Sequence, residues 1–179
     1  MRDPALWERV EPGESEWDVW IGAVWHSTTL ANASAILDSG VILPSRPDRP
    51  FRMPQTANSY ALHKGYVALF DFRDADPSLI EREHFKWSNY FCPDQVVLEV
   101  SVDQLPESLI SWRQANAETG YRKVIIPYFE AWSRHAIPIK AVPSVRYILD
   151  WNTTYARSLD DVGAVSSEIK GLLDDARNA

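Results

Sequence analysis

The chain has 179 residues, a formal net charge of −7 and a pI of about 5.1. With 45% hydrophobic and 24% charged residues, it can bury a core without a disulfide or metal staple. Cys92 is the sole cysteine, which excludes an internal disulfide. There is no signal-peptide pattern and no apolar run of about 18 residues, so we expect one cytoplasmic domain over residues 1–179, away from membranes.

An acidic balance of this size argues against a general attraction to nucleic acid. This balance leaves room for a local basic patch, because Arg46, Arg49 and Arg52 fall within the proline-rich stretch Pro44–Pro54. Guanidinium groups match phosphate oxygens, so these arginines are candidates for holding a pyrophosphate. The competing interpretation is a solvated surface loop.

The first half of the chain contains clear local signals. Residues 1–20 are predicted to be a loosely packed lead-in, and the apolar run Ile21–Thr28 predicts a buried strand. A helix should follow, with Thr28 or Thr29 as its cap and Gly40 at its left-handed end.

The remaining pattern favours strands, followed by a helix. The further expected elements are a short helix over Gln55–Lys64, strands at Tyr66–Phe72, Gln95–Val102 and Val145–Leu149, and a C-terminal helix over residues 157–177. This order predicts an α+β fold with a mostly antiparallel sheet and flanking helices.

Common catalytic and nucleotide motifs are missing from the sequence. No glycine pattern suits a phosphate loop, no Cys/His set has zinc spacing, and no GxSxG elbow occurs. The sequence therefore gives no reason to expect a metal.

Four residues remain as candidates for chemistry. His26 and Asn32 surround the predicted strand-to-helix junction, Glu130 lies among aromatic residues, and Tyr60 could stack on a flat ring. A carboxylate in apolar surroundings tends to have a raised pKa, which is common at functional sites. Each has a plainer interpretation: a core histidine, a solvated asparagine, an exposed glutamate and a packed tyrosine.

Taken together, these residues resemble a known pattern. The segment WHSTTLANASAILDSGVI is similar to the first motif of the DarT-like branch of ADP-ribosyltransferases, the domain of unknown function 4433 family. The matching positions are His26, Thr28, Asn32, Ile36, Leu37 and Gly40. Glu130, followed by Ile137-Pro138, is similar to that family's catalytic Glu block, and VVLEVSVDQLP to a central strand. The family's usual Tyr-Phe segment is replaced here by YVALFDFRD.

The resemblance implies a split antiparallel sheet of the ADP-ribosyltransferase type that binds NAD in its cleft. It implies catalytic roles for Glu130 and Arg52, and NAD contacts from His26, Thr28, Asn32 and Tyr60. The implied partners are NAD, a nucleic-acid base or protein acceptor, and an antitoxin or immunity protein if the chain is a toxin or defence effector. Two alternatives stay open: an RNA 2′-phosphotransferase-like enzyme, and a non-catalytic interaction module with a degenerate nucleotide pocket.

Overall fold

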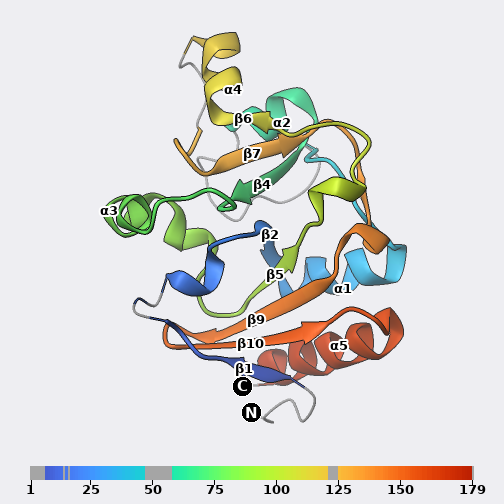
Figure 1. The fold of residues 1–179 in the computed structure, drawn as a ribbon. Helices are drawn as coiled ribbons and strands as arrows, with labels where there is room; N and C mark the ends of the chain where they lie inside the picture. The colour runs from blue at the N-terminus through green and yellow to red at the C-terminus, as the bar shows by residue number, and fades with distance from the viewer. Residues whose placement is uncertain (1–6, 14, 16, 47–57, 121–124, 179) are drawn as a thin grey trace.

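The computed structural model describes residues 7–13, 15, 17–46, 58–120 and 125–178 (Figure 1). These parts form an antiparallel sheet of eight strands in the order β1-β10-β9-β5-β2-β4-β7-β6, and a second sheet that pairs β3 with β8. The predicted α+β class with a mostly antiparallel sheet is confirmed. The strands are β1 (Glu8–Val10), β2 (Val24–Thr29), β3 (Val41–Ile42), β4 (Val67–Asp71), β5 (Gln95–Glu99), β6 (Ile110–Ser111), β7 (Glu130–Ser133), β8 (Ile137–Pro138), β9 (Ser144–Asp150) and β10 (Thr153–Ser158). The α-helices are α1 (Leu30–Ser39), α2 (Tyr60–Lys64), α3 (Pro77–Trp87), α4 (Trp112–Thr119) and α5 (Val162–Asn178).

The passage from β2 into α1 follows its sequence signals closely. Thr29 is the N-cap, and its side chain accepts a hydrogen bond from the Asn32 backbone N–H at 3.2 Å. Gly40 ends the helix in the left-handed region at φ 70°. The predicted cap and terminator are both confirmed, because each depends only on local chemistry.

Three apolar clusters hold the sheet between its helices. On one face, α1 and α5 pack side by side over the central strands (Figure 1), through buried residues such as Leu37 and Ile169. The second cluster is largely aromatic and joins Trp25 of β2 to Trp87 at the end of α3. The third joins Tyr60 of α2 to Trp132 of β7. The heavy aromatic content therefore goes mainly into the core.

The sheet opens at its centre. β2 pairs with β5 over five positions, from Trp25↔Glu99 to Thr29↔Gln95. Its pairing with β4 covers only two, Val24↔Asp71 and Trp25↔Phe70. The rest of β2 therefore has no strand partner on that side, and the two halves of the sheet separate there.

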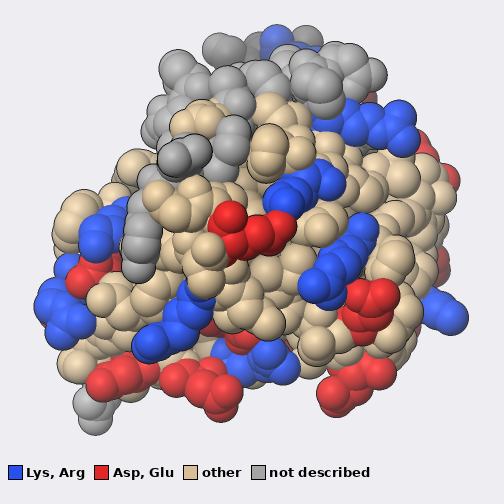
Figure 2. Space-filling model, turned by 90° about the horizontal axis from the view of Figure 1, so that it is seen from above, with Lys and Arg blue, Asp and Glu red and all other residues tan. Residues whose placement is uncertain are grey.

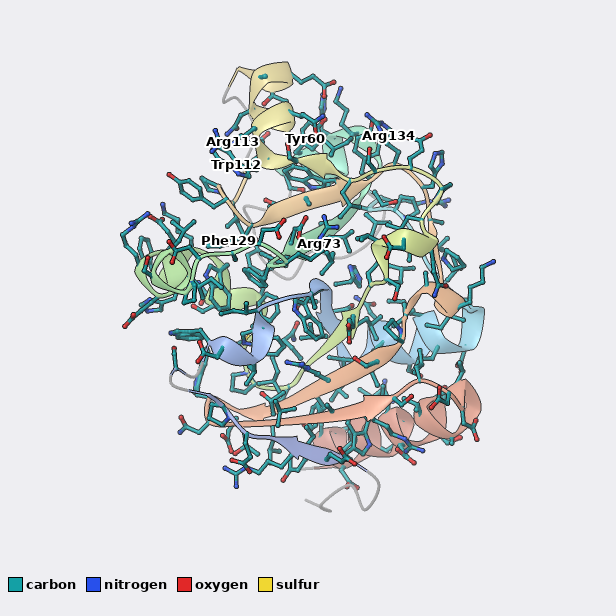
Figure 3. The ribbon with its side chains drawn as sticks, viewed as in Figure 1. Tyr60, Arg73, Trp112, Arg113, Phe129 and Arg134 are labelled. Atoms are coloured by element: carbon teal, nitrogen blue, oxygen red, sulfur yellow. The ribbon has the colours of Figure 1, made fainter. Side chains whose placement is uncertain are left out.

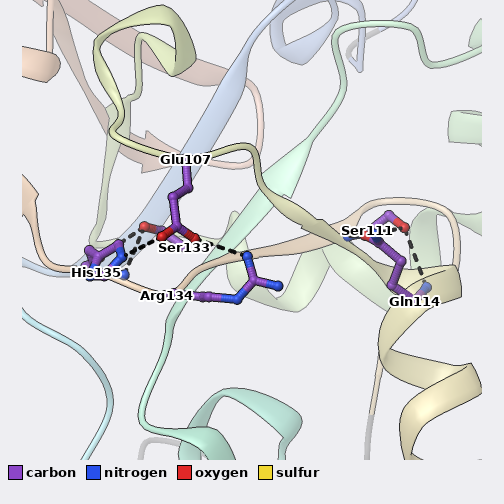
Figure 4. A network of polar contacts seen from close by, with 6 residues as sticks. All are labelled: Glu107, Ser111, Gln114, Ser133, Arg134 and His135. Atoms are coloured by element: carbon purple, nitrogen blue, oxygen red, sulfur yellow. Dashed lines mark hydrogen bonds and ion pairs between the residues drawn. The ribbon is translucent and has the colours of Figure 1, made fainter.

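The far half of the sheet ends in a small polar network (Figure 4). Glu107 accepts one hydrogen bond from Arg134 and contacts the His135 ring, each at 3.1 Å. Ser111 and Gln114 form a capping box that starts α4. These contacts anchor the short strand β6 and the chain that follows β7.

Two predictions about the ends of the chain are wrong. The lead-in is not loose throughout, because β1 joins the sheet edge and the side chains of Trp7 and Trp20 are buried. The C-terminal helix does not start at residue 157, since β10 continues to Ser158 and α5 begins at Val162. Strand β10 escaped prediction because none of its residues is fully buried and no alternation marks it.

The other predicted elements agree in type with small shifts in their bounds. β4, β5 and β9 lie within or close to the predicted strands, and β5 ends at Glu99 because a 3₁₀ turn begins at Val102. The predicted helix over Gln55–Lys64 is seen as α2, whose first predicted residues lie outside the described part of the chain.

The left-handed conformation of Gly40 predicts how a substitution there changes stability. Gly40→Ala should lower the free energy of unfolding by about 1 kcal/mol, because an added Cβ penalises this conformation. Steric clash contributes little, since the nearest atom, on Ile139, would lie at 3.9 Å. The matched control is Gly171→Ala within α5, where an added Cβ meets nothing within 4 Å. It should raise stability by about 0.5–1 kcal/mol in urea titrations; two changes of the same sign would contradict the assignment.

Candidate functional site

The separation of β2 from β4 opens into a cavity of about 580 Å³. Its polar wall comes from the end of β2, the start of α1, and residues Tyr90, Gln95 and Glu130. Its apolar wall comes from the end of α1, β3 and the segment after it, including Ile36, Val41 and Pro44. The lining thus combines hydrogen-bonding groups with apolar surface, which is typical of a small-molecule site.

His26 lies at the point where the strands part. Its Nδ1 is 3.0 Å from the Ala68 carbonyl oxygen on β4. A carbonyl can only accept, so Nδ1 carries the proton in this contact. Burial lowers the pKa of His26, and the bond to Ala68 opposes that shift only in part. The ring is therefore neutral at pH 7, and its Nε2 can accept a hydrogen bond from a ligand hydroxyl.

Thr28 and Asn32 lie along the same wall as His26. Thr28 is buried, whereas Asn32 is exposed on the first turn of α1. The Asn32 backbone is engaged by the Thr29 cap, which fixes where its side chain starts. The structure therefore brings His26, Thr28 and Asn32 together, as the local spacing predicts.

Glu130 joins this wall from the other half of the sheet. It begins β7, pairs with Phe70 of β4 and lines the cavity with only 8% of its surface exposed. Burial raises the pKa of Glu130 to about 7, although the Ile126 N–H, 2.7 Å from its Oε2, pulls in the opposite direction. A carboxyl with this pKa can exchange a proton near neutral pH.

A tight turn between Ile126 and Glu130 fixes the position of the Glu130 side chain. The Glu130 backbone N–H donates to the Ile126 carbonyl at 3.1 Å, while the Ile126 N–H binds the Glu130 side chain. Between them Tyr128 has φ 73°, a conformation that is strained for a bulky residue. Such strain is typical of positions where the surrounding structure imposes a functional geometry.

An aromatic surface adjoins this turn. The rings of Tyr128 and Trp112 lie 5.0 Å apart, and the Arg113 guanidinium is 4.9 Å from the Trp112 ring. Tyr128 is 42% exposed. Ser111 pairs with Ala131, which brings Trp112 to the level of Glu130 on the next strand. Trp112 and Arg113 lie together at the start of α4 (Figure 3), and we call these three residues the aromatic platform.

The arginine and tyrosine candidates are placed differently from His26 and Glu130. Arg52 and Arg49 lie outside the described residues, so their positions are open; Arg46 does line the cavity.

Tyr60 is not among the cavity-lining residues. It is fully buried and donates its hydroxyl hydrogen bond to Glu118, on the side of β7 that faces α2 and α4 (Figure 3). The position of Tyr60 therefore does not support direct contact with a ligand in this cavity.

Tyr90 and Gln95 are wall residues that the sequence did not single out. The Tyr90 carbonyl accepts a hydrogen bond from Ser27, and burial together with the nearby Glu130 raises the pKa of the Tyr90 hydroxyl. Gln95 is buried at the start of β5. Neither belongs to a motif, and only the pairing of β5 with β2 could have suggested Gln95.

Within the described ranges, no three His, Cys, Asp or Glu side chains lie together as a metal ion would need. In the same part of the chain, no helix is long and apolar enough to cross a membrane. No protein family matches the sequence, and no curated protein or solved structure matches it either.

The raised pKa of Glu130 predicts how stability depends on pH. Its ordinary value is 4.5, so between pH 4.5 and about 7 the unfolded chain loses a proton that the folded protein keeps. The stability that the protonated Glu130 contributes is fully present below pH 4.5 and is lost by about pH 7, a change of about 3 kcal/mol in the free energy of unfolding. Glu130→Gln should remove this loss, so urea midpoints at pH 5 and pH 8 should differ less in the variant than in the wild type. Glu81→Gln, at an exposed position on α3, should behave as the wild type; an equal pH dependence in Glu130→Gln would contradict the buried carboxyl.

Proposed function

We propose that the protein is an NAD-dependent ADP-ribosyltransferase with an ADP-ribosyltransferase-like split sheet. The observation that carries the proposal is the convergence of His26, Thr28, Asn32 and Glu130 on one cavity, at the place where β2 leaves β4. His26 and Glu130 are 104 positions apart in the chain, and the resemblance in sequence requires both at one NAD site. The presence of both residues in the lining of one cavity, from two halves of the sheet, supports the proposal.

The residues present suit NAD. The neutral His26 can accept from a ribose hydroxyl through Nε2, and Thr28 and Asn32 offer further hydrogen bonds beside it. Ile36, Val41 and Pro44 provide an apolar wall for a flat ring. Arg46, a cation on the cavity wall, can meet a pyrophosphate, so it joins Arg52 as a candidate for that role.

Glu130 is suited to the chemical step. Its carboxylate, in low-dielectric surroundings, can orient a ribose hydroxyl and stabilise the positive charge that develops at the ribose C1 as the C–N bond breaks. Nicotinamide departs with the electron pair of that bond. An acceptor oxygen or nitrogen then bonds to C1, and Glu130 accepts the proton that the acceptor loses. Both roles need the ionised form, so the rate should rise with pH through about 7.

The aromatic platform supplies a place for the acceptor. Exposed aromatic rings with an adjacent guanidinium can stack against a nucleic-acid base, and they also suit a protein side chain. Figure 2 shows positive and negative side chains interspersed on the face seen from above, rather than one continuous basic surface. The acceptor therefore stays open between a nucleic-acid base and a protein, as does an antitoxin or immunity partner.

Two other functions use the same features less fully. An RNA 2′-phosphotransferase needs a surface for RNA, which the net charge of −7 does not favour. A non-catalytic module with a degenerate nucleotide pocket would use the cavity and the platform for binding alone. It gives no role to a buried carboxyl with a pKa of about 7.

The decisive experiment is incubation with NAD labelled in both halves, together with cellular DNA, RNA and protein. Glu130→Gln should lower nicotinamide release by at least about 100-fold, since the amide cannot carry the charge or take the proton. NAD binding, measured by calorimetry, should persist. Glu81→Gln is the control for loss of a carboxylate elsewhere, and it should release nicotinamide as the wild type does.

The result also separates the alternatives. Equal release by the wild type and Glu130→Gln would remove Glu130 from the reaction. NAD binding without any release by the wild type, across all three acceptor classes, would favour the non-catalytic module.

The platform makes a second prediction. Trp112→Ala should reduce transfer to the acceptor about tenfold, because loss of a stacking partner is worth roughly 1–3 kcal/mol. Release of nicotinamide to water should stay within about twofold, since Trp112 does not line the cavity. Trp151→Ala is the control: Trp151 is a 57% exposed tryptophan at the turn between β9 and β10. Equal losses of transfer and hydrolysis would show that Trp112 acts on the NAD site instead.

A further inference from the structure

We infer that Trp132 is a positioning residue for Glu130, which it serves by offering its indole N–H to the carboxylate, and that Tyr60 and Glu118 hold the indole in place. The inference deepens the proposed function, on which its catalytic consequence rests. It also gives Tyr60 a role other than contact with a ligand.

The first observation is the strand geometry. Glu130 and Trp132 are two residues apart on β7, so their side chains leave the same face of the sheet. Trp132 is fully buried and lies opposite Ala68, the residue whose carbonyl holds His26. One short stretch of β4 and β7 therefore carries the supports of both His26 and Glu130.

The second observation is an unsatisfied donor. The Trp132 Nε1 is buried, and within the described part of the chain it has no well-formed hydrogen bond. A buried indole N–H normally finds an acceptor, because leaving it unpaired costs free energy. The Glu130 carboxylate is close enough for the indole N–H to lower its pKa. A hydrogen bond from the indole N–H to that carboxylate would satisfy the donor.

The third observation is the packing behind the indole. The Tyr60 ring meets the Trp132 ring edge to face at 4.7 Å, and its hydroxyl donates to Glu118 on α4. Glu118 is in turn paired with Lys64, at the end of α2. Two helices thus fix Tyr60, and Tyr60 limits the orientations open to Trp132.

These contacts give Glu130 two donors with different origins. The Ile126 N–H belongs to the strained turn before β7, while the Trp132 N–H belongs to the rigid core of the sheet. Other titratable groups also face the carboxyl: Tyr90 from the 3₁₀ turn after α3 and His26 from β2 line the same cavity, with Arg46 on its wall. Of these, His26 is held neutral by burial and Tyr90 has a raised pKa, so neither adds a charge near pH 7.

The test measures Glu130 directly, without NAD. In protein labelled with ¹³C at the Glu carboxyl carbon, the Glu130 signal is identified by its loss in Glu130→Gln, and its pKa is read from a pH titration. Trp132→Phe keeps a ring but removes the N–H donor, so the pKa should rise by about 0.5–1 unit. Tyr60→Phe removes the hydrogen bond to Glu118, so it should also raise the Glu130 pKa, by a smaller amount.

The matched control is Trp87→Phe. Trp87 is also fully buried and its Nε1 also lacks a partner among the described residues, but it lies at the end of α3, in the largely aromatic cluster. This change should leave the Glu130 pKa within about 0.2 units of the wild-type value. A shift in Trp132→Phe no larger than that in Trp87→Phe would overturn the inference.

A measurement on the wild type covers the case in which Trp132→Phe does not fold. The ¹⁵N–¹H signal of the Trp132 indole should move with pH at the midpoint of the Glu130 titration. A signal that does not follow Glu130 would overturn the inference as well. If the proposed function holds, the pH profile of nicotinamide release by Trp132→Phe moves alkaline by the same amount. If Trp132→Phe shifts the Glu130 pKa but the wild type releases no nicotinamide, the contact between Trp132 and Glu130 is supported and the proposed enzymatic function is contradicted.

Discussion

The early end of the pairing between β2 and β4 is the constraint on which the rest of the structure depends. After Trp25, β2 keeps its hydrogen bonds to β5 and loses those to β4. The freed Ala68 carbonyl takes the His26 ring instead. A half-buried carbonyl without a partner would destabilise the sheet, so this contact offsets a cost of the opening and also fixes the His26 tautomer. Continued pairing would have closed the space that the cavity occupies.

The opening places opposing demands on Glu130. Burial disfavours its charge, whereas the Ile126 N–H favours it, and the balance leaves the pKa at about 7. Holding that N–H in place requires the turn in which Tyr128 has a positive φ. Free energy that could stabilise the fold is therefore used to hold one carboxyl in a fixed direction, which is the usual relation between strain and function.

Local signals in the sequence predicted the parts of the fold that depend on neighbours in the chain. Thr29 and Gly40 bound α1, and the apolar runs marked β2, β4, β5 and β9. Short strands such as β6 carry no periodicity, because they depend on pairing with distant residues. Tyr60 shows the same limit at the site. Its sequence position indicated an aromatic residue near the cleft, but only the packing of α2 against β7 shows that it lies behind Trp132.

The meeting of His26 with Glu130 is the part of the site that no local rule predicts. One side chain follows from the end of β2, the other from the turn before β7, and strand β4 lies between them in the sheet. A binding module could use the same cavity with a glutamine in place of Glu130, and it would then avoid the loss of stability between pH 4.5 and 7. A reaction that needs a base and a negative charge beside a ribose cannot make that replacement. The buried carboxyl is therefore the feature that most favours chemistry over binding alone.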